Sequence, residues 1–140
     1  MAVFTASLVA RHSNKLVSVR GAGTQDGADV VQWTDKDKPN QHWNLEASTD
    51  GYYIVLALHS RKALSVTSSG TDDGATVVQW ENKGKTNQEW KLVQKDNGYF
   101  SLEARHSGKL LSVAGEDTED GAKLVQWTDR GKPNQQFRLG

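Results

Sequence analysis

The segment DGADVVQW at residues 26–33 decides the fold, because it recurs twice at a constant interval. It returns as DGATVVQW at residues 73–80 and as DGAKLVQW at residues 120–127, and each step is 47 residues with no insertion or deletion. Three copies of this length account for the chain of 140 residues. We therefore expect a single domain, residues 1–140, built from repeats at about 1–47, 48–94 and 95–140.

Each copy contains four short segments that have the composition of strands. In the first copy, Val, Leu and aromatic residues are dense at 5–11, 16–20, 29–34 and 42–46, and turn-forming residues separate these segments. No segment shows the i, i+3, i+4 apolar spacing of an amphipathic helix. Twelve strands in three equal units predict an all-β protein with pseudo-threefold symmetry. The architecture that fits is a β-trefoil, in which hairpins close a six-stranded barrel and cap one end.

Composition excludes several classes of function. Seventeen Lys and Arg balance seventeen Asp and Glu, so the chain lacks the basic excess of nucleic-acid-binding proteins. No apolar run approaches the ~20 residues of a membrane helix, so we expect no membrane insertion. There is no cysteine, and the apolar stretch 3–10 is interrupted and has no basic residue before it. We expect a cytoplasmic protein, or one released without a classical signal peptide.

Trp33, Trp80 and Trp127 are candidate binding residues because all three copies keep Trp immediately before a polar turn. One interpretation is a partly buried barrel aromatic. The other is a stacking platform for a pyranose, whose C–H-rich face matches the negative π-face of an indole. The residues alone leave both interpretations open.

Asn40, Asn87 and Asn134 end this polar turn, seven residues after each Trp. An Asn here can fix its own backbone as an Asx-turn, or its amide can hydrogen-bond the vicinal hydroxyls of a sugar. The aromatic residues that follow three positions later, at Trp43, Trp90 and Phe137, are predicted to be core residues.

We expect no catalytic residue, metal site or cofactor. His12, His59 and His106 each lie next to a Ser in a hairpin turn, and no carboxylate accompanies them in the motif, so turn hydrogen bonding is the better interpretation. Asp26 and Asp35 are too sparse for a glycosidase pair, which needs two carboxyl groups ~5–10 Å apart in a cleft. The sequence therefore predicts a protein that is not an enzyme.

The copies resemble the ricin-type β-trefoil lectins and the family 13 carbohydrate-binding modules. The Gln-x-Trp signature of these families stands at residues 41–43 and 88–90 and, in a degenerate form with Phe, at residues 135–137. The resemblance implies noncatalytic binding of sugars, frequently galactose or N-acetylgalactosamine, in up to three shallow pockets.

The resemblance also assigns a role to each carried-over position. The stacking aromatics are Trp33, Trp80 and Trp127; the hydroxyl-binding amides are Asn40, Asn87 and Asn134; the side chains that brace those amides are Gln41, Gln88 and Gln135; the backbone donors are Gly21, Ser68 and Gly115. Many family members carry an Asp in the second strand, where this chain has Ser18, Ser65 and Ser112. Serine is a weaker acceptor than a carboxylate, which favours a different sugar specificity.

The sequence thus predicts a multivalent, agglutinating lectin for terminal sugars on glycans and glycoconjugates, and it leaves a homodimer open. Three alternatives stay open beside it: a polysaccharide-binding module of a glycoside hydrolase (xylan-like), a protein-binding trefoil such as a protease inhibitor or toxin receptor-binding domain, and a symmetrised engineered trefoil. The first and third copies share Lys-Pro-Asn-Gln where the second has Lys-Thr-Asn-Gln, so we expect the second site to behave differently.

Overall fold

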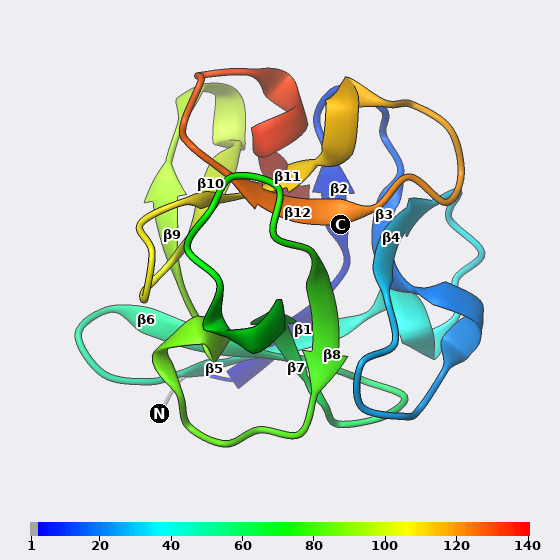
Figure 1. Ribbon diagram of the computed structural model, residues 1–140. Coiled ribbons are helices and arrows are strands. Elements are labelled where there is room, and N and C mark those ends of the chain that lie inside the picture. The colour runs from blue at the N-terminus through cyan, green and yellow to red at the C-terminus, as the bar shows by residue number, and fades with distance from the viewer. Residues whose placement is uncertain (1–2) are drawn as a thin grey trace.

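The computed structural model describes residues 3–140 and consists of short strands joined by loops and single 3-10 turns (Figure 1). The first copy holds β1 (Val3–Ala6), β2 (Leu8–Ala10), β3 (Leu16–Val19), β4 (Val30–Trp33) and β5 (Trp43–Ala47). The second holds β6 (Tyr52–Ala57), β7 (Ala63–Val66), β8 (Val77–Trp80) and β9 (Glu89–Gln94). The third holds β10 (Phe100–Ala104), β11 (Leu110–Val113), β12 (Leu124–Trp127) and β13 (Phe137–Leu139).

Residues 3–140 contain thirteen strands where the sequence predicted twelve, because the first strand is interrupted at Ser7. Its two parts pair with different partners: β1 pairs with β5 and β2 pairs with β13. At the interruption the N–H of Gly140 donates to the carbonyl oxygen of Ser7 at 3.0 Å. The two ends of the domain are therefore joined by the sheet.

The strands form the predicted barrel with hairpins. The antiparallel ring runs β1–β5–β6–β9–β10–β13–β2, and it closes because β1 and β2 are successive parts of one strand. The hairpins β3–β4, β7–β8 and β11–β12 branch from this ring, one from each copy. The prediction of an all-β trefoil is confirmed.

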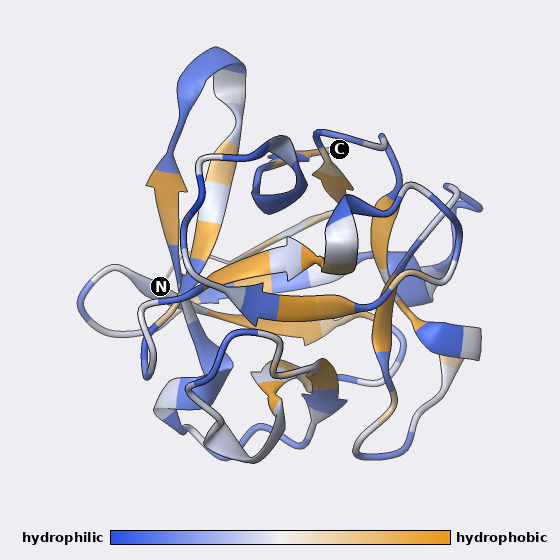
Figure 2. Ribbon diagram, turned by 45° about the horizontal axis from the view of Figure 1, so that its top comes forward, coloured by the Kyte–Doolittle hydropathy of each residue, from blue (hydrophilic) through white to orange (hydrophobic). Residues whose placement is uncertain are grey.

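The core lies inside the ring and draws equivalent residues from each copy. Strand residues form the apolar interior while loops carry the polar residues (Figure 2). Trp43, Trp90 and Phe137 are fully buried, as predicted, and the Nε1–H groups of Trp43 and Trp90 donate at 2.9 Å to the carbonyl oxygens of Val17 and Leu64.

Short 3-10 turns, which the sequence analysis did not predict, flank the hairpins. They are η1 (Arg20–Ala22), η2 (Pro39–Gln41), η3 (Thr67–Ser69), η4 (Thr86–Gln88), η5 (Asp96–Gly98), η6 (Ala114–Glu116) and η7 (Pro133–Gln135). A single turn of three residues has no periodicity by which a sequence could reveal it. Within residues 3–140, no helix has the length and apolar character needed to cross a membrane.

A buried glutamine fastens each copy to a neighbour. Gln32 has no exposed surface, and its Nε2 donates at 2.8 Å to the carbonyl oxygens of Asp117 and Glu119 in the third copy. Its Oε1 accepts from the Ser13 hydroxyl at 2.9 Å. Gln79 and Gln126 make the same contacts with the loops of the first and second copies. The three copies therefore interlock in a ring.

Trp90, the core aromatic of the second copy, provides a test of the apolar packing inside the barrel. Trp90→Ala leaves a large cavity and an unpaired carbonyl oxygen on Leu64, so we expect the free energy of unfolding to fall by about 3–5 kcal/mol. Trp90→Phe is the matched control, since Phe137 fills the equivalent place in the third copy. Urea unfolding monitored by circular dichroism checks this, and equal losses for both variants would contradict the cavity argument.

Candidate functional site

Each copy forms one surface pocket from its second and third strands and the turns beside them. The pocket volumes are about 390 Å³ in the first copy, 510 Å³ in the second and 300 Å³ in the third. Their linings contain Ser18, Gly21, Trp33, Asn40 and Gln41 in the first copy, Ser65, Ser68, Trp80, Asn87 and Gln88 in the second, and Ser112, Gly115, Trp127, Asn134 and Gln135 in the third. The structure thus brings together every predicted site residue, five to a pocket.

Strand alternation explains why Trp33 faces outward from the same strand that supplies core residues. In β4, Val30 and Gln32 are buried inside the domain, while Val31 and Trp33 line the pocket. The register with β3 sets Ser18 opposite Val31. The motif Val-Val-Gln-Trp therefore alternates between core and pocket, with the buried Gln side chain reaching the neighbouring copy.

The pocket tryptophans are half-exposed. Trp33, Trp80 and Trp127 expose 38%, 43% and 38% of their surface, whereas Trp43 and Trp90 expose none. The ring edge of each pocket tryptophan lies against a glycine of the neighbouring copy, so that a β-carbon at Gly27 would lie 3.5 Å from Cζ3 of Trp80. Gly27 has a φ of +90°, which L side chains rarely adopt. The neighbouring copy therefore covers the edge of each tryptophan ring, and in the second pocket it also contributes Gly27 and Asp29 to the lining.

The pocket asparagines hydrogen-bond the end of the second strand rather than their own turns. Nδ2 of Asn40, Asn87 and Asn134 donates at 2.8–2.9 Å to the carbonyl oxygen of Val19, Val66 and Val113. The Asx-turn interpretation is therefore wrong. Oδ1 of Asn87 and Asn134 is buried and has no partner among residues 3–140. The amide is held firmly and retains acceptor capacity.

The glutamines that follow do not brace these amides, and that prediction is wrong. Nε2 of Gln41 donates to the carbonyl oxygen of Thr34 at 2.9 Å and to the Ser18 hydroxyl at 3.2 Å, and its Oε1 accepts from the N–H of Lys36 at 2.8 Å. Gln88 and Gln135 repeat the pattern. The long glutamine side chain reaches past the adjacent asparagine, and its amide holds the loop that follows the pocket tryptophan.

The pocket serines also make hydrogen bonds within the protein, and their contact with a sugar stays a prediction. The hydroxyl of Ser18 is only 1% exposed and donates to the carbonyl oxygen of Leu16 at 2.9 Å while accepting from Gln41. Ser65 and Ser112 are equivalent. Their protons are committed inside the protein, so they lie beneath the pocket as supports.

Gly21, Ser68 and Gly115 line the pockets, and their role as backbone donors to a ligand stays a prediction. All three have left-handed conformations, with φ of 59°, 51° and 63°. Their N–H groups find no acceptor among the described residues. The polar groups at the pocket surface are thus this N–H and, in the first copy, the partly exposed Asn40 side chain, whereas Oδ1 of Asn87 and Asn134 is buried beside the tryptophan.

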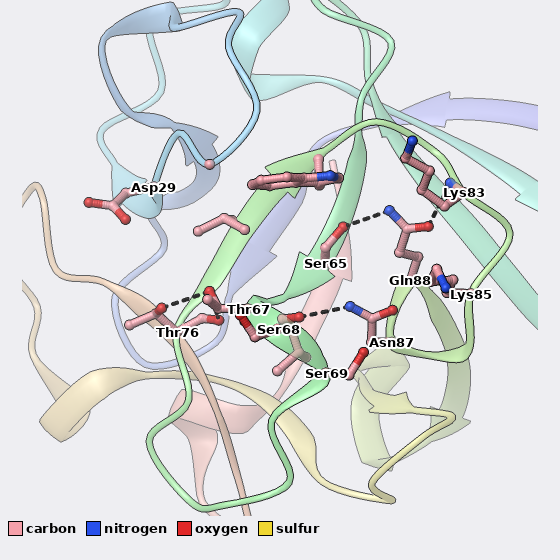
Figure 3. A pocket seen from close by; sticks show the side chains of 14 residues that line it. Asp29, Ser65, Thr67, Ser68, Ser69, Thr76, Lys83, Lys85, Asn87 and Gln88 are labelled. Atoms are coloured by element: carbon pink, nitrogen blue, oxygen red, sulfur yellow. Dashed lines mark hydrogen bonds between the residues drawn. The ribbon is translucent and has the colours of Figure 1, made fainter.

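Basic residues at the pocket rims were missed by the sequence analysis. Lys83 and Lys85 lie beside Asn87 and Gln88, with Asp29 on the far side of the pocket (Figure 3). Lys38, Lys85 and Lys132 are identical in the three copies, and this identity was the signal that could have found them. The ammonium groups of these lysines can therefore donate hydrogen bonds to a ligand that stacks on the tryptophan.

The histidines form contacts between copies. Nε2 of His59 lies 2.7 Å from the carbonyl oxygen of Gly23, and His12 and His106 make equivalent contacts with Asp117 and Gly70. The predicted hydrogen bonding of these histidines is present, and its partner is a carbonyl oxygen of a neighbouring copy. Within residues 3–140 no three His, Asp or Glu side chains gather as metal ligands.

A family model matches the chain at residues 4–80 and 81–140, and it describes the ricin-type β-trefoil lectin domain-like family. The chain belongs to this family. No curated protein sequence matches it significantly. A designed threefold-symmetric protein, ThreeFoil, is 47% identical, with a TM-score of 0.95 and 96% of each chain covered.

Solved structures of natural proteins share the architecture. An exo-β-1,3-galactanase from Clostridium thermocellum is 35% identical with a TM-score of 0.94; the match covers 96% of this chain and 29% of the galactanase. The C-half of an earthworm R-type lectin, solved in complex with GalNAc, is 17% identical with a TM-score of 0.75 and 96% of each chain covered, a likeness of fold.

The Asp26 carboxylate, which joins the first copy to the second, gives a test of how the stability of the fold depends on pH. Oδ1 of Asp26 lies 3.1 Å from Nζ of Lys62 and accepts the N–H of Glu81 at 2.9 Å, and the hydrogen bond from Lys62, above all, holds the Asp26 pKa below its ordinary value of 3.8. A lowered carboxyl pKa stabilises the fold fully above the unfolded value, and this stability is lost as pH falls through the folded value.

Asp26→Asn should therefore unfold at lower urea concentration than the natural protein at pH 6, and the difference should shrink below pH 4. The measurement is the urea midpoint of both proteins from pH 6 to pH 2.5. Glu46→Gln is the control, because the Glu46 carboxylate has no hydrogen-bond or ion-pair partner among residues 3–140. A midpoint difference that stays constant with pH would rule out this role for the Asp26 charge.

Proposed function

We propose that this protein is a noncatalytic lectin whose three pockets each bind a terminal sugar. The observation that carries the proposal is the half-exposed tryptophan kept in all three pockets, when the other two tryptophans of the chain are fully buried. Leaving a large aromatic ring open to solvent three times is costly for folding alone. A stacking role gives these rings a reason to stay at the surface.

The chemistry of each pocket matches a pyranose. The C–H-rich face of the sugar covers the indole, and its hydroxyls point to the pocket walls. In the first pocket, the Asn40 carbonyl oxygen accepts from a hydroxyl, and the Gly21 N–H donates to a neighbouring one; in the second pocket, where Oδ1 of Asn87 is buried, the Ser68 N–H donates. Lys85 at the rim supplies a further donor. One platform with donors and an acceptor beside it fixes the orientation of the ring.

Galactose or N-acetylgalactosamine is the sugar class we propose. The supporting observations are membership in the ricin-type family and the likeness to a galactanase domain and to a lectin solved with GalNAc. The glycans would be met in the cytoplasm or after release without a classical signal peptide. The buried serines leave specificity to the asparagine, the backbone donor and the rim.

Three such pockets make a multivalent protein. A single shallow site should bind at about millimolar Kd, or roughly −4 kcal/mol. The pockets belong to three copies arranged around a pseudo-threefold axis, so they face different directions and can hold different glycans. Binding to a glycan-covered surface then gains from avidity, and the protein should agglutinate cells.

Removal of the stacking platforms tests this function. Trp33→Ala, Trp80→Ala and Trp127→Ala should each remove one binding equivalent, because each indole supplies the apolar face of one pocket. Binding is measured on a glycan array and by titration of the labelled protein with the sugars that respond. Variants with two platforms removed should no longer agglutinate cells.

Leu58→Ala is the control for this series, since Leu58 is 37% exposed and lines none of the three pockets. Circular dichroism establishes that each variant is folded. A protein that is retained by no immobilised glycan, or variants that bind as the natural protein does, would refute the lectin proposal.

A second candidate is a polysaccharide-binding module. The 35% identity to a galactanase, of which this chain spans 29%, favours it, since that domain stands beside an enzyme. Pull-down on insoluble polysaccharides separates the two: retention on a polymer such as xylan or a β-1,3-galactan without agglutination supports the module, and agglutination inhibited by a monosaccharide supports the lectin.

A further inference from the structure

The first pocket carries a cation that the other two lack. Arg20 begins the turn η1 and lines the pocket together with Trp33. The equivalent residues of the second and third copies are Thr67 and Ala114. The symmetry of the site is therefore broken by a charge at one position beside the aromatic platform.

The guanidinium of Arg20 is held at the platform. Its Nη2 donates at 3.1 Å to the carbonyl oxygen of Gly121, the glycine of the third copy that lies against the Trp33 ring edge. One donor of five is thus used. No carboxylate among residues 3–140 forms an ion pair with Arg20. The rest of its planar fork is available to a ligand that stacks on Trp33.

The remaining charges of the first pocket have the same sign. Lys36 and Lys38 line it and no acidic residue does. Asp35 and Asp37 belong to the same loop but lie outside the lining, and Asp37 faces His42 at 3.3 Å. A ligand in this pocket therefore meets three cations.

The linings of the other two pockets each contain a carboxylate. Asp29 lies on the opposite side of the second pocket from Lys83 and Lys85 (Figure 3), and its Oδ2 is 3.9 Å from Nζ of Lys123. In the third pocket, Glu116 lies 3.8 Å from Lys132, with Arg130 as the second cation. The first and third pockets, which share the Pro-Asn-Gln turn and were expected to behave alike, thus differ in charge.

We propose that the first pocket prefers a sugar that bears a carboxylate, such as a uronic acid, and that Arg20 sets this preference. The inference rests on the proposed sugar-binding function. A planar carboxylate fits the guanidinium fork through two parallel hydrogen bonds, and Lys36 and Lys38 add long-range attraction. The second and third pockets, where carboxylates oppose the cations, take neutral sugars.

The test compares sugars that differ only at C6. The isotopically labelled protein is titrated with galactose and galacturonate, and with glucose and glucuronate, while the indole N–H signals of Trp33, Trp80 and Trp127 are followed by NMR. Each signal, assigned through its Trp→Phe variant, reports on its own pocket. We expect the acid to bind about two- to fivefold more tightly than the neutral sugar at Trp33, and the ratio to fall with added salt.

Two variants make the test specific. Arg20→Thr installs the residue of the second copy and should bring the ratio at Trp33 to that of the other pockets. Thr67→Arg should create an acid preference at Trp80. An unchanged ratio in Arg20→Thr, or an equal acid preference at all three indoles of the natural protein, overturns the inference and leaves the lectin proposal standing.

Sodium acetate alone distinguishes an acidic sugar from any anion. If acetate shifts the Trp33 signal as strongly as galacturonate does, the pocket recognises free anions and the inference is wrong. If no indole responds to any sugar, neutral or acidic, the proposed sugar-binding function itself fails, and this inference fails with it.

Discussion

The structure depends on a buried glutamine amide that spans two copies. Gln32 places both of its N–H donors on carbonyl oxygens of the third copy and its acceptor on a serine of its own copy, with no surface exposed. An unpaired amide in that position would cost a large part of the stability of a small domain. Hydrogen bonds as well as apolar packing therefore hold the three copies in a ring. This arrangement also places a glycine of one copy against the pocket tryptophan of the next.

The residues that recur in every copy have two roles: some hold the loops below the pocket, and others remain at its surface. Gln41 and Ser18 satisfy each other and the loop around them, so their hydrogen-bonding capacity is spent below the pocket. Trp33, the Asn40 carbonyl oxygen and the Gly21 N–H remain for a ligand. A rigid floor with few free groups lowers the ordering cost of binding, which matters where each site offers only a small contact area.

The sequence was sufficient for the fold because the 47-residue period exposes the repeat and the alternation in residues 30–33 exposes the hairpin. The resemblance to the ricin-type family named the five residues that line each pocket, and the repeat carried them to all three copies. It was wrong about what Gln41 binds, because residue type and spacing do not determine which partner a buried amide takes. The interruption at Ser7 depends on hydrogen bonds with Gly140, which the repeat does not show. Arg20 occurs in one copy only, so a comparison of residues identical in all copies could not indicate it.

The glycine wall has a consequence for how such a protein can arise by duplication. Gly27 of one copy completes the pocket around Trp80 of the next, and Gly121 returns to Trp33. One unit on its own would leave its tryptophan edge without the covering glycine, and a linear pair would cover only one such edge. A third unit closes the ring and covers all three tryptophan edges at once. Later changes in one copy then alter the pocket of its neighbour as well as its own.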